Sequence, residues 1–120
     1  MTVNTEVFDH RIPARESCVL GYLLERWAQE QPDEIAIIFH EGPSWTWSET
    51  LDHTRRVAKA LSDLGVNKGD HVLSWQPNGP VAVLTWFGLN YLGAVYVPLN
   101  TAYKGGILEH QVRISDARLI

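Results

Sequence analysis

The sequence has 120 residues, the usual size of one domain. Hydrophobic residues make up 45% and charged residues 20%, as in globular domains, which excludes a disordered tail, a collagen-like repeat and a coiled coil. The formal net charge is −4 without a basic cluster, so we expect no nucleic-acid partner. The single cysteine, Cys18, cannot form an internal disulfide and favours a reducing, cytoplasmic compartment.

We predict neither a secretory signal nor a transmembrane segment. The N-terminal residues lack the apolar core of a signal peptide. No formally charged residue occurs between Asp70 and Lys104, but prolines, glycines and asparagines interrupt this stretch. A bilayer helix needs about 20 continuous apolar residues. We therefore interpret the stretch as a buried helix followed by a buried strand.

Residues 1–16 are predicted to form an extended arm that precedes a helix. Ser17 is a suitable N-cap, apolar residues then recur at helical spacing, and Pro32 ends the pattern. Cys18 lies at the start of this helix, where a thiolate could be stabilised. A small buried residue is the simpler interpretation of Cys18.

A β-hairpin and a long helix are predicted next. Runs of β-branched and aromatic residues at 35–39 and 44–47 flank a Glu-Gly-Pro turn. Thr46 and Glu49 have the spacing of a capping box, in which each side chain bonds the backbone amide of the other residue. The solvent side of the helix that follows has polar pairs four residues apart, Asp52 with Arg56 and Glu49 with His53.

The second half of the sequence alternates strands and helices. Strands are predicted at 71–75, 94–99 and 118–120, and helices at 80–92 and from 107 onward. The run at 94–99 is apolar throughout, which is typical of the middle of a parallel sheet. The order predicts an α/β fold with an N-terminal β-hairpin and βαβαβ units of a mostly parallel sheet. Because the sequence stops inside the last strand, we expect a truncated piece of a larger domain.

The residues themselves predict no catalytic constellation. The glycine signatures of phosphate-binding loops are missing, and the five histidines lack metal-ligand spacing, so we assign no catalytic residue and no metal site. Gly105 and Gly106 beside Lys104 could offer amides to an anion, but a flexible turn is the simpler interpretation. The five tryptophans are spread along the sequence, which favours core packing over base stacking.

Several segments resemble the core motifs of the adenylate-forming, or AMP-binding, enzymes. Residues 45–49 (WTWSE) are similar to the aromatic-Thr-aromatic-x-Glu motif of that family. Residues 93–100 (GAVYVPLN) resemble its Gly-x-x-Tyr-Val-Pro-Leu-Asp/Asn motif. Between them, residues 64–72 (LGVNKGDHV) and 77–78 (PN) also match the family pattern. The resemblance extends in register from about residue 17 to residue 120.

This resemblance implies that residues 17–120 are the N-terminal portion of an AMP-binding domain that is truncated at its C-terminal end. Asn100 favours the acyl-CoA ligases over the peptide-synthetase domains, which more often have Asp there. Residues 86–89 (WFGL) are similar to the carnitine/crotonobetaine-CoA ligase branch. Thr50, where the family usually has Leu, and residues 90–92 (NYL) depart from the pattern.

The reaction implied by the resemblance is ATP-dependent acyl-CoA ligation of a small-molecule carboxylate. The full-length enzyme would use ATP, Mg and CoA. None of these is expected to bind this segment, because the family's phosphate loop, magnesium motif, ribose-binding Asp and late Lys are missing from it. The chain is expected to be inactive alone, with the remainder of its own polypeptide as its partner. The alternative is a non-enzymatic α/β binding or interaction module.

One group of candidate contact residues remains. Asn100, Thr101 and Tyr103 follow the carboxyl end of a predicted parallel strand. Open α/β sheets usually place their ligands at such strand ends. In the full-length enzyme these residues could contact CoA or the substrate, but the packing of an ordinary turn is the simpler interpretation.

Overall fold

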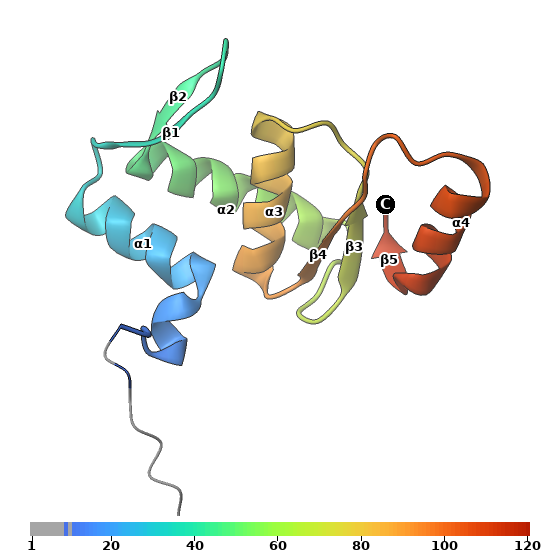
Figure 1. The fold of residues 1–120 in the computed structure, drawn as a ribbon. Helices are drawn as coiled ribbons and strands as arrows, with labels where there is room; N and C mark the ends of the chain where they lie inside the picture. Colours follow the sequence, from blue (N-terminus) through green and yellow to red (C-terminus); the bar gives the residue numbers. More distant parts are fainter. Residues whose placement is uncertain (1–8, 10) are drawn as a thin grey trace, which may run out of the picture.

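The computed structural model of the protein describes residue 9 and residues 11–120, so the predicted arm lies mostly outside the described part. Helices and strands alternate as expected (Figure 1). In chain order they are the 3-10 helix η1 (Arg15–Cys18), α1 (Leu20–Glu30), β1 (Ile35–Ile38), β2 (Ser44–Thr46), α2 (Trp47–Asp63), β3 (His71–Ser74), α3 (Pro80–Leu92), β4 (Val95–Pro98), α4 (Gly105–Ile114) and β5 (Ala117–Leu119). No helix in these ranges has the length and apolar character needed to cross a bilayer.

The first α-helix begins later than the sequence predicts. Arg15–Cys18 form η1, in which the Ser17 amide donates to the Ala14 carbonyl at 2.8 Å. Ser17 therefore lies inside a tight turn, and Val19 is the N-cap of α1 without a side-chain capping bond. The prediction of a buried Cys18 is also wrong, because this residue is exposed within the same turn.

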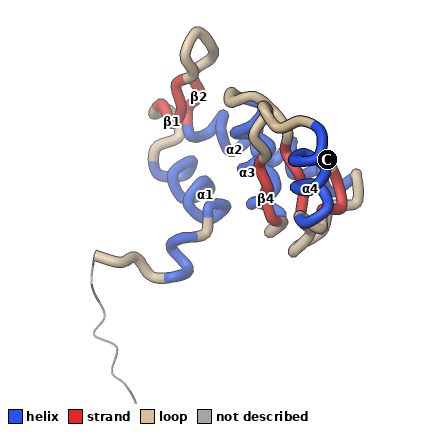
Figure 2. The backbone as a smooth tube through the Cα atoms, turned by 45° about the vertical axis from the view of Figure 1, so that its right-hand side comes forward, coloured by secondary structure: helices blue, strands red, loops and turns tan. Residues whose placement is uncertain are grey.

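The predicted hairpin and capping box are both present. β1 and β2 pair antiparallel, and Figure 2 shows this hairpin standing apart from the main sheet. The Glu49 amide donates to the Thr46 side chain at 3.1 Å, and the Thr46 amide donates to the Glu49 carboxylate at 2.9 Å. These two bonds satisfy free amides at the start of α2, so the helix begins where the sequence predicts.

One of the two predicted polar pairs on α2 is formed. Arg56 and Asp52 lie 3.0 Å apart as an exposed ion pair. The pair of Glu49 with His53 is not found among the described residues. Glu49 is held in the capping box, and the His53 ring instead lies against Trp45, with ring centroids 4.8 Å apart. This ring contact joins the hairpin to the first turns of α2.

The main sheet has three parallel strands in the order β4-β3-β5. α3 connects β3 to β4, α4 connects β4 to β5, and the two helices lie on opposite sides of the sheet (Figure 1). This confirms the predicted α/β fold. The expected central position of β4 is wrong for the described part of the chain, because β3 is central and β4 is an edge. An apolar strand bounded by apolar neighbours does not reveal its place in the strand order.

Hydrogen bonds at the amino ends of β3 and β4 fix the register of these strands. The Gly69 amide donates to the Gly93 carbonyl at 2.9 Å, and the Val95 amide donates to the Asp70 carbonyl at 2.8 Å. Gly93 ends α3 with a φ of +76°, a left-handed conformation that favours glycine. The turn after α3 therefore aligns β4 with β3 before the ladder begins.

The hydrophobic core lies where α2 and α3 pack against one face of the sheet. Its buried members are Val66, Val72, Leu89 and Ala94. The two helices approach closely at Gly88, where a methyl group would lie 2.7 Å from a Val57 methyl carbon and 3.2 Å from the Ala58 amide nitrogen. The small size of glycine therefore permits this helix crossing.

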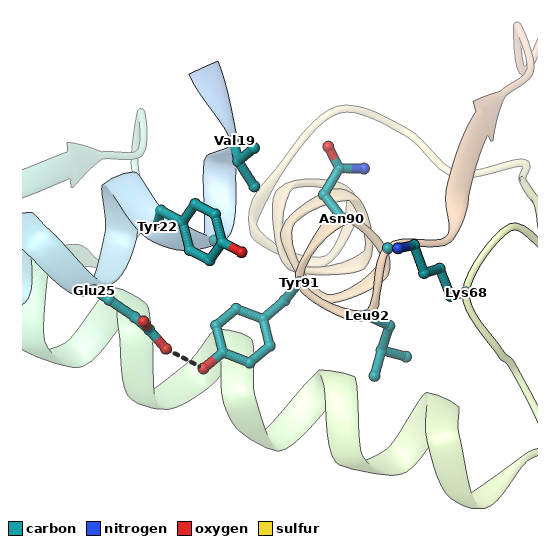
Figure 3. A pocket seen from close by; sticks show the side chains of 9 residues that line it. Val19, Tyr22, Glu25, Lys68, Asn90, Tyr91 and Leu92 are labelled. Carbon is teal, nitrogen blue, oxygen red and sulfur yellow. Dashed lines mark hydrogen bonds between the residues drawn. The ribbon is translucent and has the colours of Figure 1, made fainter. Parts of the chain in front are cut away.

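A polar cluster of Glu25, Arg55 and Tyr91 links α1, α2 and α3. Figure 3 shows the bond between Glu25 and Tyr91. The Tyr91 hydroxyl donates to Glu25 Oε1 at 2.6 Å and accepts from Arg55 Nε at 3.2 Å. A second guanidinium nitrogen of Arg55 lies 3.4 Å from the same carboxylate oxygen. The hydrogen bond from Tyr91, supported by Arg55, lowers the pKa of Glu25. Hydrogen bonding to Tyr91 and Glu25 raises the pKa of Arg55.

Two tryptophans do not lie in the core that the sequence predicts for them. Trp86 of α3 is 44% exposed and stacks on Tyr96 of β4, with ring centroids 6.3 Å apart. Trp75, just after β3, is also exposed, as is Val81 in the first turn of α3. α3 is apolar on nearly all sides, but only part of its surface is covered within the described chain.

Candidate functional site

The carboxyl ends of β3 and β4 lie at the same edge of the sheet, because these strands are adjacent and parallel. The loops to α3 and α4 both leave the sheet at this edge, at the top of Figure 1. Beyond the ladder, the Leu99 amide donates to the Ser74 carbonyl at 2.8 Å. The predicted site residues follow directly after Leu99, at the kind of strand end where open α/β sheets place ligands.

Asn100, Thr101 and Tyr103 lie together in the turn that follows β4. Asn100 Oδ1 accepts from the Ala102 amide at 2.9 Å, and the Asn100 carbonyl accepts from the Tyr103 amide at 3.1 Å. Asn100 therefore shapes the turn through its side-chain oxygen. Thr101 is exposed and Tyr103 is half-buried. Each of these two residues adds a hydroxyl group to the turn.

A cavity of about 330 Å³ lies in the neighbouring loop between β3 and α3, lined by residues 76–81. α3 begins at Pro80, whose fixed φ suits the first position of a helix. The N-cap, Gly79, has no side chain to cap the amides of the first turn. On the helix side, the Thr85 hydroxyl lies 3.4 Å from the side-chain oxygen of Gln76. The loop thus combines apolar walls with uncapped helix amides.

The start of α4 differs from the flexible turn that the sequence predicts at Gly105 and Gly106. These glycines are the first two residues of the helix, and Lys104 is its N-cap without a side-chain capping bond. Gly105 has a φ of +57°, which lies in the left-handed region and favours glycine. The glycine pair therefore forms the sharp entry into α4.

Ser74 is a polar residue of this edge that the sequence reasoning did not single out. It is 4% exposed, and its hydroxyl has no hydrogen-bond partner among the described residues. A buried hydroxyl without a partner costs about 1–3 kcal/mol. The signal in the sequence is a serine within the apolar run 71–75. Ser74 thus contributes unused hydrogen-bonding capacity at the end of the central strand.

The described residues contain no group of three His, Cys, Asp or Glu side chains placed to hold a metal ion. Two of the scattered histidines have structural contacts instead. His71 Nδ1 lies 2.7 Å from the Ser115 carbonyl oxygen and joins β3 to the end of α4. His53 packs against Trp45. The donor set that a divalent cation requires is therefore not assembled in this part of the chain.

Comparison with known protein families assigns the chain to one of them. Residues 24–120 match the AMP-binding enzyme family, and the chain therefore belongs to it. The chain is 35% identical over 97 residues to the 2-succinylbenzoate–CoA ligase of Oceanobacillus iheyensis, covering 81% of this chain and 20% of that protein. It is 30% identical over 111 residues to the long-chain-fatty-acid–CoA ligase of Bacillus subtilis, covering 92% of this chain and 20% of that protein.

Solved structures of the family share the fold. A fatty acyl CoA synthetase of Mycobacterium tuberculosis has a TM-score of 0.78 and 26% sequence identity, with 83% of this chain and 20% of that chain covered. The chain therefore spans about a fifth of the length of these relatives. Their names specify different carboxylates, so they do not single out a substrate. The similarity of residues 86–89 to the carnitine/crotonobetaine-CoA ligases stays a prediction.

Proposed function

We propose that the chain is the N-terminal portion of an ATP-dependent acyl-CoA ligase. The observation that carries this proposal is the family match over residues 24–120, together with relatives that are named as CoA ligases. In this proposal, residues 17–120 form the folded unit of the chain and residues 1–16 form an arm. Its partners would be the remainder of its own polypeptide and a small-molecule carboxylate.

The proposed reaction has two steps. A carboxylate oxygen attacks the α-phosphorus of Mg-ATP, which forms an acyl-adenylate and releases pyrophosphate. The sulfur of CoA then attacks the acyl carbon, its thiol proton is released, and AMP leaves as the thioester forms. Such transfers depend on positioning and on stabilisation of developing charge around the phosphates. No metal-binding cluster exists among the described residues, so we assign no Mg ligand to them.

The role we propose for this segment is to build a wall of the ligase and to present one turn to the substrates. Asn100 holds the turn after β4 through the bond from the Ala102 amide. Thr101 and Tyr103 would then contact CoA or the carboxylate. Their position at the carboxyl end of a parallel strand supports this assignment. The buried Ser74 hydroxyl nearby gives the same edge an unused polar group.

A domain exchange tests the proposed function. Residues 24–120 would replace the matching segment of the Bacillus subtilis long-chain-fatty-acid–CoA ligase, which is 30% identical. We expect the chimera to catalyse carboxylate-dependent exchange of pyrophosphate into ATP, and the 120-residue chain alone to show none. A chimera that unfolds cooperatively and binds ATP but shows no exchange would contradict the proposal. Exchange by the isolated chain would contradict its proposed inactivity.

The predicted contact turn is tested in the same chimera. We expect Tyr103→Ala to raise the KM for CoA or for the carboxylate several-fold, while a substitution of an exposed lysine on α2, Lys59→Ala, leaves both unchanged. Retention of both KM values in Tyr103→Ala would assign this residue to turn packing. The matching measurement on Thr101→Val separates the hydroxyl of the turn from the aromatic ring.

A further inference from the structure

A second pocket, of about 570 Å³, surrounds the C-terminal turn of α3 (Figure 3). Its residues come from α1, from the loop before β3 and from the end of α3. Lys68 precedes β3 and Gly93 precedes β4, so the pocket lies at the amino end of these strands. It is therefore distinct from the turn at Asn100, which follows the carboxyl end of β4. A volume of this size suits a small organic molecule.

One side of this pocket is aromatic, and one of its two rings is held in place. Tyr22 and Tyr91 both line it, and Figure 3 shows them on one side of the last turn of α3, with Lys68 on the other. The Tyr91 ring is fixed by its hydrogen bonds to Glu25 and Arg55. A ring held in this way binds a flat or apolar group without losing side-chain freedom, and Tyr22 adds an exposed aromatic surface beside it.

The charges around the pocket favour an anion. The carboxylate of Glu25 is already matched, because it accepts from Tyr91 and lies 3.4 Å from the guanidinium of Arg55. Lys68 lines the pocket and forms no ion pair among the described residues. Its aliphatic stem lies 3.0 Å from the position of a methyl group on Gly93, so the lysine is seated against the end of α3. One carboxylate, Glu25, and two cations, Arg55 and Lys68, together carry a net charge of +1.

We propose that this pocket, the tyrosine–lysine pocket, binds an elongated organic anion. The apolar or aromatic body of the ligand lies against Tyr22 and Tyr91, and its carboxylate lies at Lys68. The side-chain amide of Asn90, which also lines the pocket, supplies a further hydrogen-bond donor. This proposal does not depend on ligase activity, because every residue that it uses lies in the described part of the chain.

The test uses a matched pair of probes, 4-phenylbutyrate and its neutral amide, titrated into the isotope-labelled 120-residue chain. We expect the backbone amide signals of Gly21, Asn90 and Gly93 to shift with the acid. The acid should bind about threefold more tightly than the amide, as for an exposed charge pair. Lys68→Gln should remove this difference and leave binding of the amide unchanged, whereas Lys59→Gln on α2 should change neither.

Tyr22→Ala separates the aromatic wall from the charge. We expect it to weaken the acid and the amide by the same factor, about fivefold, because it removes an apolar contact shared by both probes. Tyr22 is 65% exposed, so its replacement leaves the fold intact. Equal affinities of acid and amide for the wild-type chain would overturn the anionic class of ligand. The lack of shifts at all three amides would overturn the site.

Discussion

The hydroxyl of Tyr91 in α3 donates a 2.6 Å hydrogen bond to the carboxylate of Glu25 in α1, across 66 residues of sequence. We expect Tyr91→Phe to lower the free energy of unfolding by about 1 kcal/mol, because it removes a hydrogen bond to a charged group in a partly exposed setting. Urea denaturation measures the change. Tyr22→Phe is the matched control, since Tyr22 is exposed and should tolerate the same substitution. Equal losses in both variants would contradict a role of this bond.

The same cluster predicts a pH dependence of stability. The hydrogen bond from Tyr91 lowers the pKa of Glu25 in the folded state. The ionised carboxylate therefore stabilises the fold fully above the ordinary carboxyl range, and this contribution is lost as the pH falls through the lower folded pKa. We expect the stability difference between the wild type and Glu25→Gln to be present at about pH 7 and to shrink below about pH 4. A constant difference over this range would argue against it.

The close approach of α2 and α3 predicts the effect of a single methyl group. We expect Gly88→Ala to destabilise the chain by about 1–3 kcal/mol, because the new carbon would lie 2.7 Å from a Val57 methyl carbon. Thermal unfolding monitored by circular dichroism measures the loss. Gly106→Ala is the control, since nothing lies within 4 Å of a methyl group there. Adding Val57→Ala should recover part of the loss, and no recovery would place the strain elsewhere.

The open edge of β4 predicts self-association of the isolated chain. Val95 on this edge is 42% exposed, and Trp86 beside it is 44% exposed. Unpaired strand edges with apolar neighbours promote pairing between molecules. We expect the apparent mass in analytical ultracentrifugation to rise with protein concentration and Val95→Lys to suppress this rise. Ile107→Lys, on the exposed surface of α4, should have no such effect; equal suppression by both would indicate general solubility.

The order of elements was predictable from the sequence because local signals mark most boundaries, although not the start of α1. Thr46 and Glu49 define the start of α2, and Pro80 and Gly93 define the ends of α3. The place of each strand in the sheet was not predictable in the same way. β4 is apolar throughout, as a central strand would be, but it lies at an edge of the described sheet. Strand order depends on contacts between distant segments that periodicity does not encode.

The polar features of the chain also differ in how far the sequence predicts them. The turn at Asn100 was found because its residues are neighbours in sequence and follow a recognisable strand. The cluster of Glu25, Arg55 and Tyr91 was not, because its members come from three helices. The buried hydroxyl of Ser74 had a local signal, a polar residue in an apolar strand, but its lack of a partner is visible only in three dimensions.

The hydrogen bond from Gly69 to Gly93 has a consequence at the far end of the sheet. A slip of one residue between β3 and β4 would turn Tyr96 to the opposite face, away from Trp86. It would also displace the turn at Asn100 by about 3.3 Å along the strand. The position of the candidate contact residues is thus set by the strand register at the amino end of the sheet. A glycine outside their turn fixes that register.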